Sequence, residues 1–422
     1  MGMVTLQNRG GGKIMTGNVI VGQSGGPTSV INASLVGVYK TAHDMGADKI
    51  YGMLNGMFGF LDEKYVDLKQ HIHNDLEIEL LKRTPSSYLG SCRFKLPDYN
   101  VDEKPYIKAF GILKKLDIKY FFYIGGNDSM DTLCKMGEYG RKIGSDIRFV
   151  GVPKTIDNDL DGTDHTPGFG SAAKYIGSVM KEVIRDNKVY GSDLIAVVEI
   201  MGRNAGWLTA ASALSKAEDC EGPEMILLPE ITFDPEKFLS ETVQRHKEKK
   251  AFVIAVSEGI MTKDGKYVCE MNKKSEYKDA FGHTSLGGTA LFLADFLAQN
   301  MGIKTRGFSL GPLQRCASHI VSRTDMTEAF QVGAEAVKEA VLGKSEIMTV
   351  IKRLSNAPYR IDIMSTEVSK IANVEKKVPL DWINSDNISV TKQCVDYMKP
   401  LIIGELSPFM VEGMPRHLFL EL

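Results

Sequence analysis

Residues 150–159 read Val-Gly-Val-Pro-Lys-Thr-Ile-Asp-Asn-Asp and carry an apolar run at 147–152 into a polar, charged turn. Such a run is typical of a β-strand, and in an open α/β sheet ligands bind outside the carboxyl ends of the strands. At this strand end Asp157 could accept a proton from a substrate hydroxyl, Asp159 could help to hold a metal ion, and Lys154 could neutralise phosphate charge. A turn rich in Asp and Asn with a solvated lysine explains the same residues equally well.

The composition is that of an ordinary globular protein. The chain has 422 residues, 43% of them hydrophobic and 25% charged, which is enough for two or three domains. Its 51 basic and 53 acidic side chains give a net charge of −2, so the overall charge favours neither nucleic acid nor an anionic membrane as partner. Any anion site must therefore be a local concentration of charge.

Cysteine usage and hydropathy predict a cytoplasmic location. The six cysteines include no Cys-x-x-Cys pair and the eight histidines show no zinc spacing, which favours free thiols in a reducing compartment. No stretch reaches the ~18 apolar residues of a membrane span. Residues 1–15 lack the apolar centre of a signal peptide, and we interpret them as a flexible leader.

Predicted strands and helices alternate along most of the chain, which indicates doubly wound parallel sheets. The strands are expected at 17–21, 119–124, 147–152, 194–200, 225–228, 252–256 and 307–310. The helices are expected at 28–45, 104–116, 130–143, up to about 187, 204–215 and 286–300. The last region, 349–422, is expected to contain helical stretches and offers no chemistry that we can identify.

Two glycine turns each lead from a strand into a helix. Residues 22–27 read Gly-Gln-Ser-Gly-Gly-Pro, and residues 125–129 read Gly-Gly-Asn-Asp-Ser. Such turns offer backbone N–H groups and a helix dipole to an anion, although the steric need for glycine in a tight turn explains the first turn about as well. In the second turn Asn127 and Asp128 could serve magnesium and phosphate, or could simply cap the helix.

Charged side chains also recur beside strand ends. Arg93 follows a Gly-Ser turn, and a guanidinium presents a planar fork to phosphate oxygens. Four more such residues are Arg203, Glu258, Arg306 and Arg315. Taken singly, each has a commoner role as a surface or ion-paired residue. Their shared placement favours a single crevice that collects strand ends from both halves of the chain.

In this order the motifs resemble those of the phosphofructokinase family, and more closely its pyrophosphate-dependent branch. The resemblance runs from about residue 17 to beyond Arg315 and is modest at each motif, but the set is highly specific. It is carried by Gly25-Gly26, Gly90-Ser-Cys-Arg93, Gly125-Gly-Asn-Asp-Ser129, Pro153-Lys-Thr-Ile-Asp-Asn-Asp159, Met201-Gly-Arg203, Ser257-Glu258 and Gln314-Arg315.

The resemblance implies transfer of a phosphoryl group from pyrophosphate to the 1-hydroxyl of fructose 6-phosphate, with Asp157 as the base. Positioning and charge neutralisation supply most of the catalysis in such a reaction. The sugar phosphate would be bound by Thr155, Ile156, Asp157, Met201, Gly202, Arg203, Glu258, Arg306 and Arg315. The phosphoryl donor would lie along Gly25, Arg93, Gly126 and Ser129.

Two positions bear on the choice of donor, because ATP-using relatives have glycine at both. Asp128 would place a carboxylate where the α-phosphate of ATP must pass, a repulsion on the order of 4 kcal/mol at an effective dielectric of about 20. Lys154 would supply a cation to the phosphate that is transferred or released. With Asp157 and Arg203 these two residues form the expected catalytic set.

A magnesium ion is implied at Asn127 and Asp159. Much of the family has aspartate in place of Asn127, and an amide is the weaker ligand. The metal would therefore depend more on Asp159, Asp128 or the oxygens of the donor.

Two further departures concern the subunit interface. Leu194 replaces an arginine that bacterial ATP-using enzymes contribute to a neighbour's site, and Pro312 replaces a histidine. Arg306 matches a family arginine that crosses the interface. A homo-oligomer, a dimer or a tetramer, is therefore implied, with its order left open.

The expected architecture is two Rossmann-like domains with the active site in the cleft between them. Residues 16–168 with about 314–368 would form the donor domain, 169–313 the sugar-phosphate domain, and 369–422 a C-terminal helical extension. Alternatives are an ATP-dependent phosphofructokinase and a regulatory subunit without turnover. A dehydrogenase also fits the α/β pattern, but the chain lacks the dinucleotide glycine fingerprint.

Overall fold

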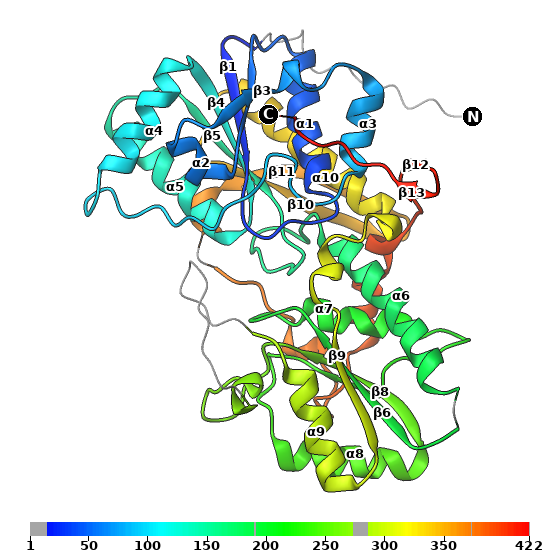
Figure 1. Ribbon diagram of the computed structural model, residues 1–422. Helices are drawn as coiled ribbons and strands as arrows, with labels where there is room; N and C mark the ends of the chain where they lie inside the picture. The colour runs from blue at the N-terminus through cyan, green and yellow to red at the C-terminus, as the bar shows by residue number, and fades with distance from the viewer. Residues whose placement is uncertain (1–14, 190, 273–285, 373, 422) are drawn as a thin grey trace.

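Two β-sheets occupy separate lobes of the molecule (Figure 1). The computed structural model describes residues 15–189, 191–272, 286–372 and 374–421. The first sheet has seven strands and the second has four. The predicted α/β class with doubly wound parallel sheets is confirmed, and antiparallel strands are added at both edges of the first sheet.

The first sheet has the strand order β11-β10-β5-β4-β1-β2-β3. Its strands are β1 (Asn18–Gln23), β2 (Ile50–Met53), β3 (Tyr65–Asp67), β4 (Ile118–Gly125), β5 (Arg148–Pro153), β10 (Ile347–Asn356) and β11 (Tyr359–Glu367). Its helices are α1 (Ile31–Asp44), α2 (Gly56–Leu61), α3 (Asp75–Arg83), α4 (Lys104–Lys115), α5 (Asn127–Lys142) and α10 (Arg323–Val341).

Both faces of the first sheet are covered, because side chains alternate between them along each strand. Val19 and Val21 of β1 pack in the core that holds α1, α3 and α10. Ile20 packs on the opposite face, in the core that holds α2, α4 and α5. A strand buried on both faces is apolar on both, which explains the apolar run 120–124 in β4 after Lys119.

The second sheet is wholly parallel, with the order β7-β8-β6-β9. It contains β6 (Leu194–Ile200), β7 (Met225–Leu227), β8 (Ala251–Ser257) and β9 (Lys304–Ser309). The helices α6 (Phe169–Asn187) and α7 (Trp207–Ala210) cover one face, and α8 (Pro235–Glu248) and α9 (Thr289–Met301) cover the other. Short 3-10 turns complete the lobes, among them η2 (Ala211–Ser215) and η4 (Gly311–Arg315).

The C-terminal region differs from the prediction of helical stretches over 349–422. Its first part forms the antiparallel pair β10–β11, and β11 alternates polar and apolar residues as a strand at the edge of a sheet does. Beyond β11 the only α-helix in the described residues is α11 (Lys392–Met398). The rest is extended chain with the 3-10 turns η6 (Val368–Lys370), η7 (Leu380–Trp382) and η8 (Lys399–Ile402) and the hairpin β12 (Met410–Val411) and β13 (Met414–Pro415).

The N-terminal residues, the cysteines and the possibility of a membrane span were also subjects of prediction. The flexible leader predicted for 1–15 lies outside the described residues, except for Met15, which is buried. The six cysteines all lie within them and none forms a disulfide. Among the helices that the structure describes, none combines the length and apolar character that a membrane span requires.

Candidate active site

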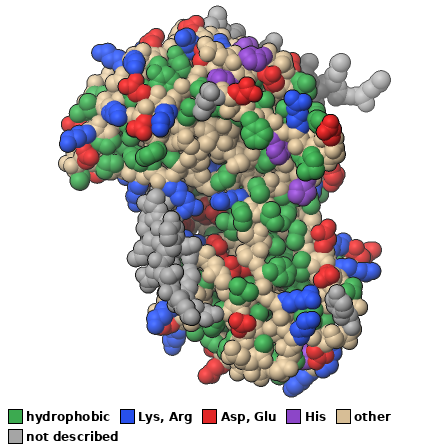
Figure 2. Space-filling model, viewed as in Figure 1, with side chains coloured by type: hydrophobic (Ala, Val, Ile, Leu, Met, Phe, Trp, Pro, Cys, Tyr) green, Lys and Arg blue, Asp and Glu red, His purple; other side chains and the backbone are tan. Residues whose placement is uncertain are grey.

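A cleft of about 680 Å³ lies where the strand ends of the two sheets face each other. Its walls come from the turns after β1, β4 and β5 in the first lobe and after β6 and β8 in the second. Figure 2 shows the surface hollowed between the lobes, with Lys and Arg side chains gathered there. This is the crevice that the strand-end rule predicts for a ligand.

Most of the predicted site residues line this cleft. They are Gly25, Arg93, Gly126, Asn127, Asp128, Ser129, Lys154, Thr155, Ile156, Asp157, Asp159, Met201, Arg203, Glu258 and Arg315. Gly202 lies just behind it, where its N–H donates to Glu258 Oε1 at 3.4 Å and its carbonyl accepts a hydrogen bond from Ser257. Gly202 therefore orients Glu258.

Arg306 is the predicted residue that the structure does not bring into the cleft. It lies on β9, with a guanidinium nitrogen 3.8 Å from Asp186 Oδ2, in a separate depression of the second lobe. A single chain thus gives Arg306 no access to a ligand in the cleft. Its role in a neighbouring subunit's site stays a prediction.

Lys154 occupies the centre of the cleft wall in the first lobe, directly after β5. Its side chain is only 4% exposed, and its Nζ donates to the carbonyl oxygen of Gly26 at 2.8 Å. A Cβ on Gly25 would come within 3.1 Å of the same Nζ, and the Lys154 N–H donates to the carbonyl of Gly125. Lys154 therefore touches both glycine turns. Burial lowers its pKa to about 8, although Asp157 and Asp159 oppose this shift.

The second glycine turn places the N-terminus of α5 in the cleft. Helix α5 begins at Asn127, three residues before the predicted start, so Asp128 lies in its first turn rather than before it. A Cβ on Gly125 would lie 2.0 Å from Ser129 Oγ, which explains why this position is glycine. Asp128 is exposed to solvent, and the Asn127 Nδ2 donates to the carbonyl of Val374 at 2.8 Å.

Asp157 and Asp159 flank Asn158, whose φ of 54° makes the turn between them. The Thr155 hydroxyl donates to Asp157 Oδ2 at 3.2 Å and accepts the Asp157 N–H at 3.1 Å. Burial raises the pKa of Asp157, against the opposing charges of Lys154, Arg315 and Arg203. Burial, followed by the charges of Asp157 and Glu375, raises the pKa of Asp159 to about 7. Both carboxyl groups are thus more basic than in water.

Three side chains from the later part of the chain complete the opposite wall. The backbone of Arg203 packs against the turn that follows β8, since a Cβ on Gly259 would lie 1.8 Å from the Arg203 carbonyl oxygen. Burial raises the pKa of Glu258 to about 7. Arg315, at the end of η4, extends toward the first glycine turn, where a Cβ on Gly26 would lie 3.3 Å from its Nη1. Cations from both lobes therefore converge on one space.

Comparison with known proteins agrees with this geometry. The profile of the family described as Phosphofructokinase matches residues 18–340. The chain belongs to the phosphofructokinase family. It is 41% identical over 408 residues to the pyrophosphate–fructose 6-phosphate 1-phosphotransferase of Methylococcus capsulatus, covering 96% of each chain. It is 39% identical to the protein of the same name from Halomonas elongata, covering 94% of this chain and 95% of that one.

A solved structure is similar to this phosphofructokinase over nearly its whole length. It is the pyrophosphate-dependent phosphofructokinase from Marinobacter aquaeolei, with a TM-score of 0.85, 37% identity and 96% of both chains covered. The resemblance to the pyrophosphate-dependent branch is thereby confirmed. The family profile ends at residue 340, so β10, β11 and all later residues lie beyond it.

The cleft of this phosphofructokinase also contains residues that the sequence did not single out. Ser24 and Pro27 belong to the first glycine turn, and Asn204 and Ala205 directly follow Arg203, so their motifs could have indicated them. Tyr267 and Glu375 carry no such signal. Glu375 comes from the C-terminal region, where the sequence shows neither a motif nor a clear periodicity.

Proposed function

We propose that this phosphofructokinase transfers a phosphoryl group reversibly from pyrophosphate to the 1-hydroxyl of fructose 6-phosphate. The products are fructose 1,6-bisphosphate and phosphate. The observation that carries the proposal is the buried Lys154 ammonium, which donates to the Gly26 carbonyl in the first glycine turn and interacts with the charge of Asp157. ATP-using members of the family have glycine at this position. The names of the relatives from Methylococcus capsulatus and Halomonas elongata support the same donor and acceptor.

In the forward direction Asp157 accepts the proton of the sugar 1-hydroxyl. The hydroxyl oxygen forms a bond to one phosphorus of pyrophosphate, and the bond from that phosphorus to the bridging oxygen breaks. The departing phosphate gains negative charge, which the Lys154 ammonium stabilises in a water-poor part of the cleft. Asp157 suits the role of base because its burial raises its pKa, and the Thr155 hydroxyl fixes its orientation.

Sugar and donor would meet within the cleft, each held mainly by a different set of side chains. Arg203, Glu258 and Arg315 line the part of the wall formed by the later chain, and we propose that they hold fructose 6-phosphate. Arg93 and the N-terminus of α5 lie on the first lobe and would hold pyrophosphate, since both attract phosphate oxygens. The first lobe would thus be the donor domain and the second the sugar-phosphate domain.

A magnesium ion is proposed beside Asp159 and Asn127. The described residues hold no cluster of three or more His, Cys, Asp or Glu side chains arranged for a metal. The site nevertheless fits magnesium, which usually takes one or two protein carboxylates and completes its shell with phosphate oxygens and water. The pKa of Asp159 is raised first by burial and then by repulsion from Asp157 and Glu375, and a dication would relieve that repulsion. Bound there, magnesium would neutralise charge on the donor.

We also propose that the enzyme works as a homo-oligomer. Arg306 projects from the second lobe outside the cleft of its own chain, and its family counterpart crosses a subunit interface. The mass of the assembly in solution, measured by light scattering, tests this directly: a monomer at assay concentration that is fully active would contradict it.

An assay of the purified protein with fructose 6-phosphate and either pyrophosphate or ATP tests the function. We expect turnover with pyrophosphate and magnesium, and at least ~10-fold less with ATP. The Asp157→Ala protein, purified in the same way, controls for contaminating kinases. Turnover that requires ATP would identify an ATP-dependent enzyme, and binding of the sugar phosphate without turnover would identify a regulatory subunit.

Replacing Arg203 or Arg315 by methionine should weaken sugar-phosphate binding selectively. A charge-assisted hydrogen bond to phosphate is lost in each case, so we expect the KM for fructose 6-phosphate to rise about 10-fold or more. The KM for pyrophosphate should change much less. The exposed Arg360 on β11 provides the matched control, Arg360→Met. Equal increases in both KM values would contradict a role in binding the sugar phosphate.

The pH profile should report the ionisation of Lys154. Its pKa is lowered to about 8, so as the pH rises through this value the ammonium loses its proton and the cation disappears. We therefore expect kcat/KM for pyrophosphate to fall above about pH 8. Bound phosphate favours the charged form, so kcat itself should fall only at higher pH. The residual activity of Lys154→Met should not show this fall in kcat/KM at alkaline pH. If the fall is still present in Lys154→Met, another group causes it.

A further inference from the structure

The segment 374–378, beyond the family match, connects the two lobes behind the cleft. Figure 1 shows the orange chain after β11 passing from the upper lobe to the lower one. In the first lobe, Asn127 Nδ2 donates to the Val374 carbonyl and the Lys376 N–H donates to the Asp159 carbonyl, each at 2.8 Å. In the second lobe, Trp207 Nε1 donates to the Lys376 carbonyl at 3.0 Å. The segment therefore contacts both lobes at the base of the site.

The side chain of Lys376 binds the loop that follows Asp157 and Asp159. Its Nζ donates to the carbonyls of Asp164 at 2.7 Å and Thr163 at 3.1 Å, and lies 3.4 Å from Asn158 Oδ1. The ammonium also lies over the Trp207 ring, 5.5 Å from its centroid. Burial lowers its pKa to about 8. Such a group is kept inside the protein only where its donors find acceptors.

Tyr397, on α11, holds the same loop from a second side. Its hydroxyl donates to the Asp164 carbonyl at 2.6 Å and accepts a hydrogen bond from Asn158 Nδ2 at 3.0 Å. Asn158 is fully buried, and its Oδ1 also accepts the Thr166 N–H at 3.1 Å. Hydrogen bonds to the side-chain amide of Asn158 therefore fix this residue between Asp157 and Asp159. Lys376 and Tyr397 contribute two of these bonds.

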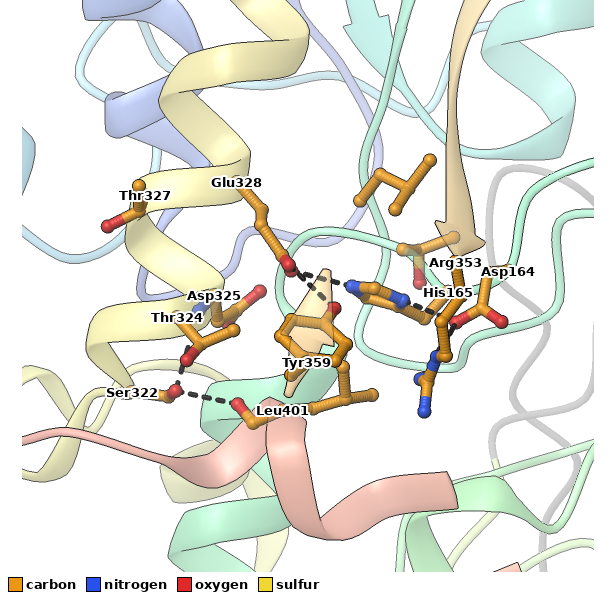
Figure 3. Close-up of polar contacts among 12 residues, drawn as sticks. Asp164, His165, Ser322, Thr324, Asp325, Thr327, Glu328, Arg353, Tyr359 and Leu401 are labelled. Carbon is orange, nitrogen blue, oxygen red and sulfur yellow. Dashed lines mark hydrogen bonds and ion pairs between the residues drawn. The ribbon is translucent and has the colours of Figure 1, made fainter. Parts of the chain in front are cut away.

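The side chains of Asp164 and His165, further along the loop, are bonded to the first lobe, as Figure 3 shows. The His165 ring lies between Asp164 Oδ1 at 2.8 Å and Glu328 Oε2 of α10 at 2.7 Å. Arg353 of β10 donates to the same Asp164 oxygen at 2.8 Å from Nη2, and the Tyr359 hydroxyl donates to Glu328 Oε1 at 2.6 Å. Lys376 and Tyr397 each contact both the Asp164 carbonyl and the Asn158 side chain, so they connect this anchored part of the loop to the turn that carries Asp157 and Asp159.

We propose that Lys376 and Tyr397 are positioning residues that hold the Asp157-Asn158-Asp159 turn in its reactive geometry. Neither residue lies within the family match at 18–340 and neither lines the cleft. The inference rests on the proposed function, because the turn carries the base Asp157 and the metal ligand Asp159. Displacement of a base by about 1 Å can lower a rate ~10²-fold while leaving bound substrates in place.

The test compares Lys376→Met and Tyr397→Phe with a matched lysine elsewhere. Lys376→Met keeps the apolar stem against Trp207, and Tyr397→Phe keeps the ring that packs on Trp207 and Trp382. Lys174 of α6 is the control, since its Nζ also donates to a carbonyl of the C-terminal region, Gly404 at 2.8 Å, but far from the turn. A purely structural effect should be alike in Lys376→Met and Lys174→Met.

We expect Lys376→Met to lower kcat about 10-fold or more, with each KM within about twofold, and Tyr397→Phe to act in the same direction less strongly. Lys174→Met should lower Tm without lowering kcat. Equal kcat losses in the two lysine variants, or a normal kcat in both Lys376→Met and Tyr397→Phe, would overturn the proposal. If Lys376→Met does not fold, Tyr397→Phe decides alone.

Hydrogen exchange separates this inference from the proposed function. In Lys376→Met and Tyr397→Phe the amide of Thr166, which donates to Asn158 Oδ1, should exchange faster, whereas Lys174→Met should leave it unchanged. This measurement needs no turnover. A wild-type protein that is inactive with pyrophosphate would contradict the proposed function. An unchanged exchange rate of the Thr166 amide in both Lys376→Met and Tyr397→Phe would contradict the positioning role.

Discussion

Asp157→Ala is expected to lower kcat in the forward direction by ~10²-fold or more, with little change in either KM. The reason is that the sugar hydroxyl loses the group that accepts its proton, whereas the residues that bind both phosphates remain. Steady-state kinetics with fructose 6-phosphate and pyrophosphate measures the effect. Near-normal turnover would show that Asp157 is not the base.

The control for Asp157→Ala is Asp161→Ala. Asp161 is exposed, lies four residues further along the same loop and does not line the cleft. It should therefore keep wild-type kinetics. A large loss of kcat in Asp161→Ala would mean that any disturbance of the loop lowers kcat. The loss of kcat in Asp157→Ala would then not identify Asp157 as the base.

The double variant Asp128→Gly/Lys154→Gly is expected to lose most activity with pyrophosphate and to gain measurable activity with ATP. Lys154→Gly removes the cation beside the departing phosphate, so kcat with pyrophosphate should fall ~10²-fold. Asp128→Gly removes the charge and bulk that oppose an α-phosphate. Kinetics with both donors on the two single variants and the double variant decides the matter. An unchanged preference for pyrophosphate would place donor selection elsewhere in the cleft.

The structure gives the two donor-selecting positions unequal weight. Asp128 is exposed, so solvent screens its repulsion of an α-phosphate. Between unit charges 4 Å apart that repulsion ranges from about 1 kcal/mol in water to about 4 kcal/mol at a dielectric of 20. Lys154 is buried and acts where screening is weak. We therefore expect Lys154→Gly to change the pyrophosphate kinetics more than Asp128→Gly changes ATP binding.

The sequence predicted the site where a motif coincided with a strand end. The turn at 153–159 follows an apolar strand and carries its own charges, so its place in the cleft could be inferred, while the roles of its side chains stay a prediction. The start of α5 was placed three residues too late, because Asn127 and Asp128 also suit a cap before a helix. At β11 polar and apolar residues alternate in the sequence, but the expectation for 349–422 names only helical stretches and no strand.

The residues behind the site could not be predicted in this way. Lys376 lies 218 residues after Asn158, and its two shortest side-chain hydrogen bonds are to backbone carbonyls, which leave no trace in the side-chain pattern. Glu375 enters the cleft only because the extended chain around it crosses between the lobes. Arg306 shows the opposite case, since it has a family match yet lies outside the cleft of its own chain.

The crossing of 374–378 between the lobes also bears on when the enzyme becomes active during synthesis. Every strand of both sheets precedes this segment, so a nascent chain can form both sheets before Lys376 and Tyr397 leave the ribosome. Until then Asn158 lacks two of its hydrogen-bonding partners and, among the described residues, the turn that carries Asp157 is held only by its contacts with Thr155 and Thr166. We therefore expect a growing chain that stops before residue 374 to form both sheets but to transfer phosphoryl groups more slowly than a chain that includes Lys376 and Tyr397.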